Sequence, residues 1–202
     1  MATSKSISLI AIFGAIIGIL EIFPIIGITD IPFPLYPKLT IDPTGIVIIL
    51  GYLILGFIPS LTLCGFALIF IGYRNIFGAI FKVLSELFNL IGFAIGFTLN
   101  RKIKLKNEFI MPFIFGIIFR VILMHISNYF LLQIFYGIPP EVVIALLPII
   151  DIFNTLQGSI NMTIAPLIIR ALPKEIIEKF GNHSSSVEDS TFSHSDTKSP
   201  SI

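Results

Sequence analysis

The sequence predicts an all-α, polytopic membrane protein, in which six transmembrane helices form one bundle with both termini inside the cell. The 202 residues are 55% hydrophobic and only 12% charged, and the mean hydropathy is +0.97. A soluble domain of this size could not keep so much apolar surface away from water. The net charge of +1 argues against a nucleic-acid-binding protein, because such proteins present a strongly basic face. We therefore expect a multi-pass protein of the cell membrane, surrounded by membrane lipid.

Six apolar segments define the expected helices, at approximately 6–27, 43–58, 60–73, 75–99, 109–136 and 141–172. The first is long enough to span a bilayer, which takes about 20 residues, and no small-residue signal-peptide cleavage site follows it. The second and third are short and nearly contiguous, so we expect a tight helical hairpin or tilted, partly interfacial helices. The bundle forms one domain over 1–180, and the Ser-rich tail over 181–202 is expected to be disordered.

The segment between the first two helices is rich in proline, with Pro32, Pro34, Pro37 and Pro43. This spacing forbids a regular helix and favours an extended, stiff loop. With six spans and the N-terminus inside, most Lys and Arg residues fall on the inner side, including the RKIKLK run at 101–106. The positive-inside rule supports this orientation. It places the proline-rich loop and the YGIPPE turn at 136–141 outside.

Polar and ionisable side chains recur at helical spacing inside three predicted spans. They are Lys82, Glu86 and Asn89 in the fourth segment, Arg120, Ser127 and Asn128 in the fifth, and Asp151, Asn154, Gly158 and Asn161, with Gln157 beside them, in the sixth. At about 100° per residue each set forms one stripe. Such groups are costly in a membrane and normally face a protein interior or a wet cavity. We therefore expect the three stripes to converge.

Two interpretations of the stripes are open. The side chains could pair with one another and hold the bundle together, for example Lys82 with Glu86 and Arg120 with Asp151. Alternatively, amides, hydroxyls and both signs of charge could form a pocket for a polar ligand with a planar or zwitterionic part. Most of these groups would then be unpaired without ligand, so the empty pocket would be wet.

The sequence lacks the motifs of common catalytic sites. It contains no G-x-S-x-G, no H-E-x-x-H and no P-loop, and the single Cys64 lies in an apolar run. We expect no enzymatic activity, no cofactor and no metal site. A transporter without its own ATPase must use an ion gradient or an ATPase on another subunit.

The first predicted helix carries small residues four positions apart, Ala11 with Ala15 and Gly14 with Gly18. This spacing lets another helix approach closely, either within the bundle or from a partner protein. Together with the chain length, the six spans, the loop that runs into LTIDPTG and the FNTLQG of the last helix, the pair Ala11 and Ala15 resembles the substrate-binding membrane subunits (S components) of energy-coupling-factor (ECF) vitamin transporters. The resemblance covers roughly residues 6–172 and is closest to the riboflavin-type branch. Pro43 stands at a different place from the proline of many riboflavin-type members, so the identity of the vitamin stays open.

The resemblance implies a vitamin-binding subunit with a site near the outer face. The three stripes would supply polar contacts, through Lys82, Glu86, Asn89, Arg120, Asn128, Asp151, Asn154, Gln157 and Asn161. Phe33 and Tyr36 in the proline-rich loop would cover a flat ring. The face of Ala11 and Ala15 would dock on a transmembrane coupling protein driven by two cytoplasmic ATP-binding subunits.

Three alternatives stay open. One is a small secondary transporter in which Glu86 or Asp151 carries a proton, although no inverted repeats are detectable. Another is an intramembrane enzyme, or a lipid-modifying one, that uses His125 and Asp151 as an acid–base pair. The third is a structural subunit of a larger membrane complex, which would not need the polar stripes.

Overall fold

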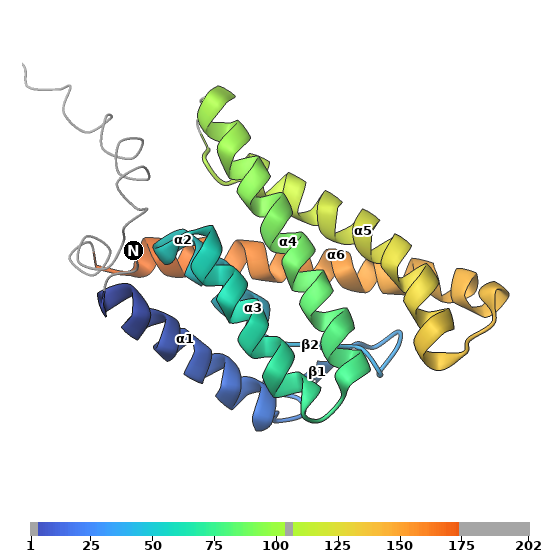
Figure 1. The fold of residues 1–202 in the computed structure, drawn as a ribbon. Coiled ribbons are helices and arrows are strands. Elements are labelled where there is room, and N and C mark those ends of the chain that lie inside the picture. The colour runs from blue at the N-terminus through green and yellow to red at the C-terminus, as the bar shows by residue number, and fades with distance from the viewer. Residues whose placement is uncertain (1–3, 104–106, 174–202) are drawn as a thin grey trace, which may run out of the picture.

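The chain folds into a helical bundle with a short β-hairpin (Figure 1), seen here in a computed structural model. The structure describes residues 4–103 and 107–173, so the predicted tail over 181–202 lies outside the described residues. The elements in chain order are α1 (Ser4–Ile22), β1 (Ile31–Pro32), β2 (Thr40–Ile41), α2 (Thr44–Leu55), α3 (Phe57–Gly72), α4 (Ile76–Ile103), α5 (Ile110–Tyr136) and α6 (Pro140–Ala171).

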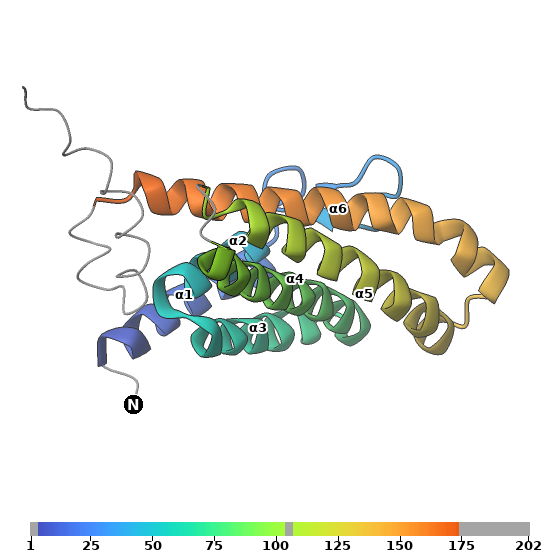
Figure 2. The same cartoon turned by 90° about the horizontal axis from the view of Figure 1, so that it is seen from above.

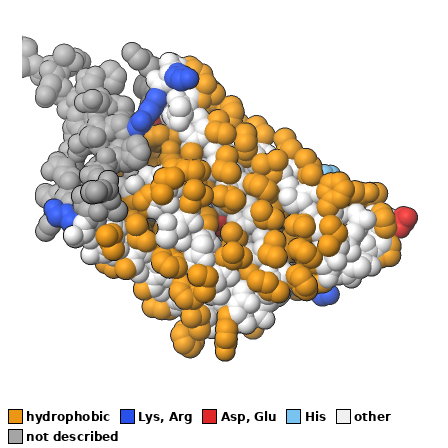
Figure 3. Space-filling view, in the orientation of Figure 1, with side chains coloured by type: hydrophobic (Ala, Val, Ile, Leu, Met, Phe, Trp, Pro, Cys, Tyr) orange, Lys and Arg blue, Asp and Glu red, His pale blue; other side chains and the backbone are white. Residues whose placement is uncertain are grey.

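The predicted helical class is confirmed, and the apolar helices fit a membrane protein. The helices α1, α4, α5 and α6 are long and apolar enough to cross a bilayer, whereas α2 and α3 are shorter. Six crossings and the N-in orientation therefore stay predictions. Figure 3 shows hydrophobic side chains over most of one face, with Lys and Arg side chains at its margins. On α5, Ile114, Ile118, Ile122 and Ile126 are all exposed, which is the pattern of a lipid-facing stripe.

The first helix ends earlier than predicted. We expected it to run to residue 27, but α1 ends at Ile22. Pro24 explains the difference, because it has no N–H to donate and disfavours the helical conformation at Phe23. Gly27 then adopts a positive φ of 85°, which a residue with a side chain rarely does.

The proline-rich loop was predicted to be extended and stiff. In the structure it instead folds back on itself. Strands β1 and β2 pair antiparallel, with Ile31 opposite Ile41. At the tip, the backbone N–H of Phe33 donates to the carbonyl of Leu39 at 2.8 Å. The Phe33 ring is buried and contacts Phe153 of α6, with 5.5 Å between ring centroids. The loop is thus held against α6, as the view from above shows (Figure 2).

Close helix packing fixes the centre of the bundle. Helix α4 packs along α5, α5 along α6, and α2 contacts both α3 and α6. Glycines allow the closest approach, because a Cβ at Gly92 of α4 would lie 2.5 Å from the backbone oxygen of Phe115 in α5. A side chain there would push the two helices apart. The polar faces of α4, α5 and α6 are held together by this packing.

Candidate functional site: a buried polar cluster

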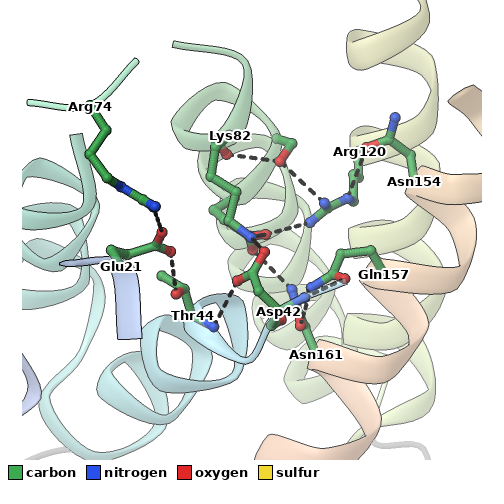
Figure 4. Close-up of polar contacts among 11 residues, drawn as sticks. Glu21, Asp42, Thr44, Arg74, Lys82, Arg120, Asn154, Gln157 and Asn161 are labelled. Carbon is green, nitrogen blue, oxygen red and sulfur yellow. Dashed lines mark hydrogen bonds and ion pairs between the residues drawn. The ribbon is translucent and has the colours of Figure 1, made fainter. Parts of the chain in front are cut away.

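Charged and amide side chains from α4, α5, α6 and the loop before α2 meet inside the bundle (Figure 4). We call this group the polar cluster and define it by Asp42, Lys82, Ser85, Glu86, Arg120, Asn154, Gln157 and Asn161. All except Lys82 are buried, and Lys82 is partly exposed. The predicted convergence of the stripes therefore occurs for most of their members.

Glu86 lies at the centre of the polar cluster and is 1% exposed. Its Oε1 accepts a hydrogen bond from Arg120 Nη1 at 3.0 Å, and its Oε2 accepts one from Asn161 Nδ2 at 3.0 Å. Lys82 Nζ lies 3.5 Å from Oε1. The predicted pairing of Lys82 with Glu86 is present, and the carboxylate joins α4, α5 and α6.

Arg120 uses all parts of its guanidinium within the cluster. Nη1 binds Glu86, Nη2 donates to Ser85 Oγ at 3.2 Å, and Nε donates to Asn154 Oδ1 at 3.2 Å. The predicted partner of Arg120 was Asp151, and this prediction is wrong. Asp151 lies three residues before Asn154, which places it about 60° around α6 from that residue, so its side chain faces a different part of α5.

Asp42, at the end of the proline-rich loop, is a cluster member that the sequence interpretation did not select. Lys82 Nζ donates to Asp42 Oδ2, and the N–H of Thr44 donates to Oδ1 at 3.0 Å. Gln157 of α6 binds the Asp42 backbone, donating from Nε2 to its carbonyl at 2.7 Å. A signal was present, because Asp-Pro before a helix favours a turn closed by the Asp side chain.

A second missed residue, Glu21, links the cluster to α1. Its Oε1 accepts a hydrogen bond from Thr44 Oγ1 at 2.5 Å, and Arg74 Nη2 lies 3.8 Å from Oε2. Glu21 is 6% exposed although it is near the end of an apolar helix. Thr44 therefore contacts both Glu21 and Asp42, which connects the last turn of α1 to the start of α2.

The charges of the polar cluster balance one another. Asp42 and Glu86 contribute two negative charges, and Lys82 and Arg120 contribute two positive ones. We expected most of these groups to be unpaired without ligand, and this expectation is wrong. An unpaired charge away from water is costly, so the side chains satisfy one another.

Asn89 is the exception to this pairing. It is fully buried, and neither Nδ2 nor Oδ1 has a hydrogen-bond partner among the described residues. It comes one turn after Glu86 on α4, and a Cβ at Gly158 of α6 would lie 3.7 Å from its Oδ1. Asn89 therefore presents an unused donor and an unused acceptor next to the polar cluster.

Two other predicted site residues lie apart from the cluster. Asn128 is buried, but its Nδ2 donates to the carbonyl of Met124 in its own helix at 2.7 Å. Asp151 pairs with His125, with 2.7 Å between Oδ2 and Nδ1, and the two side chains are 25% and 48% exposed. The structure thus brings together the two residues of the enzyme alternative, but on the outside of the bundle.

Phe33 and Tyr36, the two aromatic residues predicted to cover a ligand, lie in different environments. Phe33 is buried against Phe153, whereas Tyr36 is only half-buried in the turn that follows. The N–H of Tyr36 donates to the carbonyl of Phe33 at 3.1 Å, which closes this turn. The loop that carries both rings leads through β2 directly to Asp42.

The two small-residue pairs of α1 face opposite environments. A Cβ at Gly14 would lie 2.6 Å from the Phe66 ring of α3, and Gly18 is similarly packed against Phe70. Ala11 and Ala15 are exposed. The glycines serve packing within the bundle, whereas the alanines lie on the exposed surface of α1.

The fold and the cluster define a class, namely a helical membrane protein with a buried, charge-balanced polar network beneath a folded loop. Within the described ranges, no group of three or more His, Cys, Asp or Glu side chains could hold a metal ion. No protein-family model matches the sequence, and no curated protein matches it significantly. The function is therefore inferred from the cluster itself.

Proposed function

We propose that this chain is the substrate-binding membrane subunit of an ECF-type importer in the cell membrane. In this proposal it captures a vitamin from outside, with riboflavin as the first candidate. It delivers the vitamin inward together with a transmembrane coupling protein and two cytoplasmic ATP-binding subunits. The proposal rests on the family resemblance and on one observation, the convergence of charged and amide groups from three helices and the loop before α2.

The composition of the cluster favours ligand binding over simple helix packing. Helix association in membranes needs only small residues and a few hydrogen bonds, whereas this cluster collects four charges and several amides at one place. Ionisable groups inside membrane helices are costly and mark ligand or ion sites. Asn89 adds an unpaired amide beside them.

To enter the site, a ligand would have to replace hydrogen bonds and ion pairs that already exist within the polar cluster. Lys82 is the partly exposed member, and its partner Asp42 lies at the end of the folded loop. Movement of this loop would release both Lys82 and the backbone contacts of Gln157 to Asp42. A polar, planar ligand could then take up the freed donors and acceptors, with Phe33 and Tyr36 above it.

Ligand identification tests the proposal. The full chain is purified in mild detergent, denatured, and its supernatant is analysed by absorbance, fluorescence and mass spectrometry. Riboflavin, thiamine and related compounds are then titrated onto the unliganded protein. We expect one vitamin to bind with a Kd in the nanomolar range, which corresponds to about 12 kcal/mol.

Two variants of neighbouring residues provide the control. Asn154→Leu removes a buried acceptor of Arg120, whereas Thr155→Leu changes an exposed residue one position further on α6. We expect Asn154→Leu to weaken vitamin binding and Thr155→Leu to leave it unchanged. If no water-soluble vitamin binds the wild-type chain, the proposal fails.

The partner interaction is tested on α1. Ala11→Leu adds bulk to the exposed face, whereas Gly14→Leu adds bulk against Phe66 inside the bundle. We expect Ala11→Leu to fold normally and bind vitamin but to lose co-purification with the coupling protein, and Gly14→Leu to lower thermal stability. Unchanged co-purification of Ala11→Leu would count against docking through this face.

A structural role is the second candidate, and one observation favours it. The charges of the polar cluster pair with one another, so the network could serve only to fix the bundle. In that case a variant that replaces the network with apolar residues of similar volume would fold and assemble normally. A vitamin-binding protein with the same replacement would fold but lose its ligand.

A further inference from the structure

A groove lies between the first turns of α5 and the last turns of α6. It has a volume of ≈ 380 Å³, and its lining includes Asn107, Phe109, Ile114, Met162, Leu167 and Arg170. The polar residues Asn107 and Arg170 lie near the helix ends, whereas Ile114 and Met162 lie further along the helices. Apart from Thr163, the groove is therefore polar at the end of the bundle and apolar toward its middle.

An aromatic contact holds the Arg170 side chain at the polar end. The guanidinium carbon of Arg170 lies 5.0 Å from the centroid of the Phe109 ring. Phe109 contacts Phe97, with 6.5 Å between centroids, and Phe97 carries Arg101 at 5.0 Å. Two guanidinium groups are thus held on neighbouring rings where α4 and α6 have their basic ends and α5 begins.

The contact with Phe109 leaves Arg170 able to bind an anion. In the described part of the chain, its N–H groups have no hydrogen-bond partner, and the side chain is exposed. A cation–π contact does not use up the N–H donors of a guanidinium, and two of these donors fit two oxygens of a phosphate. Glu108, which precedes Phe109, does not line the groove.

We propose that this groove is a binding site for an anionic phospholipid. The phosphate would bind Arg170 and Asn107, and an acyl chain would lie along Ile114, Met162 and Leu167. The two-ended polarity of the groove supports a lipid, because a phospholipid in a bilayer has its charge at the interface and its chains toward the centre. A free phosphate would match only the polar end. The site is separate from the polar cluster, so this proposal does not depend on the transport function.

The absence of tryptophan from the sequence allows a direct test. Leu167→Trp, at an exposed lining position, places a single fluorophore in the groove. Ile7→Trp provides a control near the start of α1, at an exposed position two residues after Lys5 in the sequence. Each full-length variant is reconstituted in phosphatidylcholine vesicles that contain increasing fractions of brominated phosphatidylglycerol or brominated phosphatidylcholine. Bromine quenches a tryptophan that it contacts.

We expect Leu167→Trp to prefer brominated phosphatidylglycerol over brominated phosphatidylcholine by about five-fold or more, since one basic residue contributes that much attraction for an anionic lipid. Adding Arg170→Gln should reduce this preference to the level of the Ile7→Trp control. Adding Lys5→Gln should leave it unchanged, and Arg170→Lys should give an intermediate value.

Three results would overturn the proposal. The first is an equal lipid preference at Leu167→Trp and Ile7→Trp, which would reflect general surface charge. The second is a preference that survives Arg170→Gln. The third is loss of the preference in excess inorganic phosphate, which would assign the polar end to a free anion. Low reactivity of the buried Cys64 thiol in each variant verifies that it is folded.

Discussion

Substitution of Glu86 by Gln tests whether the polar cluster carries much of the stability of the bundle. Glu86 is 1% exposed and contacts Arg120, Asn161 and Lys82 at 3.0, 3.0 and 3.5 Å. Gln has nearly the same volume but no charge. The variant therefore leaves two cations, the buried Arg120 and the partly exposed Lys82, facing one carboxylate, that of Asp42.

The expected cost follows from this imbalance. Removing one partner of a buried ion pair destabilises a protein by about 3–5 kcal/mol. The amide oxygen that Glu86→Gln introduces can still accept one of the hydrogen bonds, so we expect a value near the lower limit, about 3 kcal/mol. This free energy corresponds to about a hundred-fold change in the population of the opened protein.

Cys64 provides the assay, because it is the only cysteine in the sequence and is 4% exposed. A fluorogenic maleimide reacts with it only after the bundle opens. Under conditions where closing is faster than labelling, the labelling rate reports the opened population. We expect Glu86→Gln to be labelled about a hundred-fold faster than wild type.

The control is Glu141→Gln, which removes the same charge from an exposed position in the first turn of α6. Adding Arg120→Gln to Glu86→Gln restores charge balance and leaves the pair of Asp42 with Lys82. The double variant should therefore be more stable than the sum of the two single changes predicts, by about 2 kcal/mol. If Glu86→Gln is labelled no faster than Glu141→Gln, the cluster does not stabilise the bundle in the way argued.

Two further predictions follow from the loop and the start of α2. Gly45→Ala places a Cβ where Asn161 Nδ2 and Glu86 Oε2 now lie, so it should destabilise the protein by about 3 kcal/mol in a thermal unfolding assay. The control Gly65→Ala, whose Cβ would have no neighbouring atom within 4 Å, should leave the stability unchanged. Equal stability of the two variants would contradict the packing described. Burial, and then the nearby Asp42 carboxylate, raise the pKa of the Asp30 carboxyl in the loop above its ordinary value. The ionised form therefore costs stability above the folded-state pKa, and Asp30→Asn should raise the unfolding temperature at neutral pH. This gain should shrink between the folded-state and unfolded-state pKa values and vanish below both; a gain that is constant with pH would refute the assignment.

The helices could be predicted from the sequence because their signals are local. The fifth segment was expected at about 109–136, and α5 spans Ile110–Tyr136. Its end is marked by Gly137, which has a φ of 62°, and by the prolines that follow. Glycine and proline punctuate helices wherever they occur. The end of α1 could have been predicted on the same basis, because Pro24 is a local signal that ends a helix.

The cluster could be predicted only in part, because pairing depends on how the helices are rotated and how deep each residue lies. Helical periodicity was sufficient to place Lys82 and Glu86 on one face of α4. It could not show whether Arg120 would meet Glu86 or Asp151, since both are acidic and both lie on neighbouring helices. Asp42 was missed because it comes from a loop and lies outside the apolar spans in which helical spacing makes a polar stripe recognisable.

The junction between α2 and α3 has a consequence for membrane topology. With 12 and 16 residues, these helices extend only about 18 and 24 Å, which is less than the roughly 30 Å of a hydrocarbon core. Gly56 joins them in a buried turn with a φ of 93°. Its N–H donates to Tyr52, and its carbonyl accepts from Ser60. Helices α2 and α3 together bring the chain back toward the side from which α2 started, whether or not the turn at Gly56 emerges from the lipid. A chain with four crossings and a chain with six crossings therefore place every other loop on the same side of the membrane.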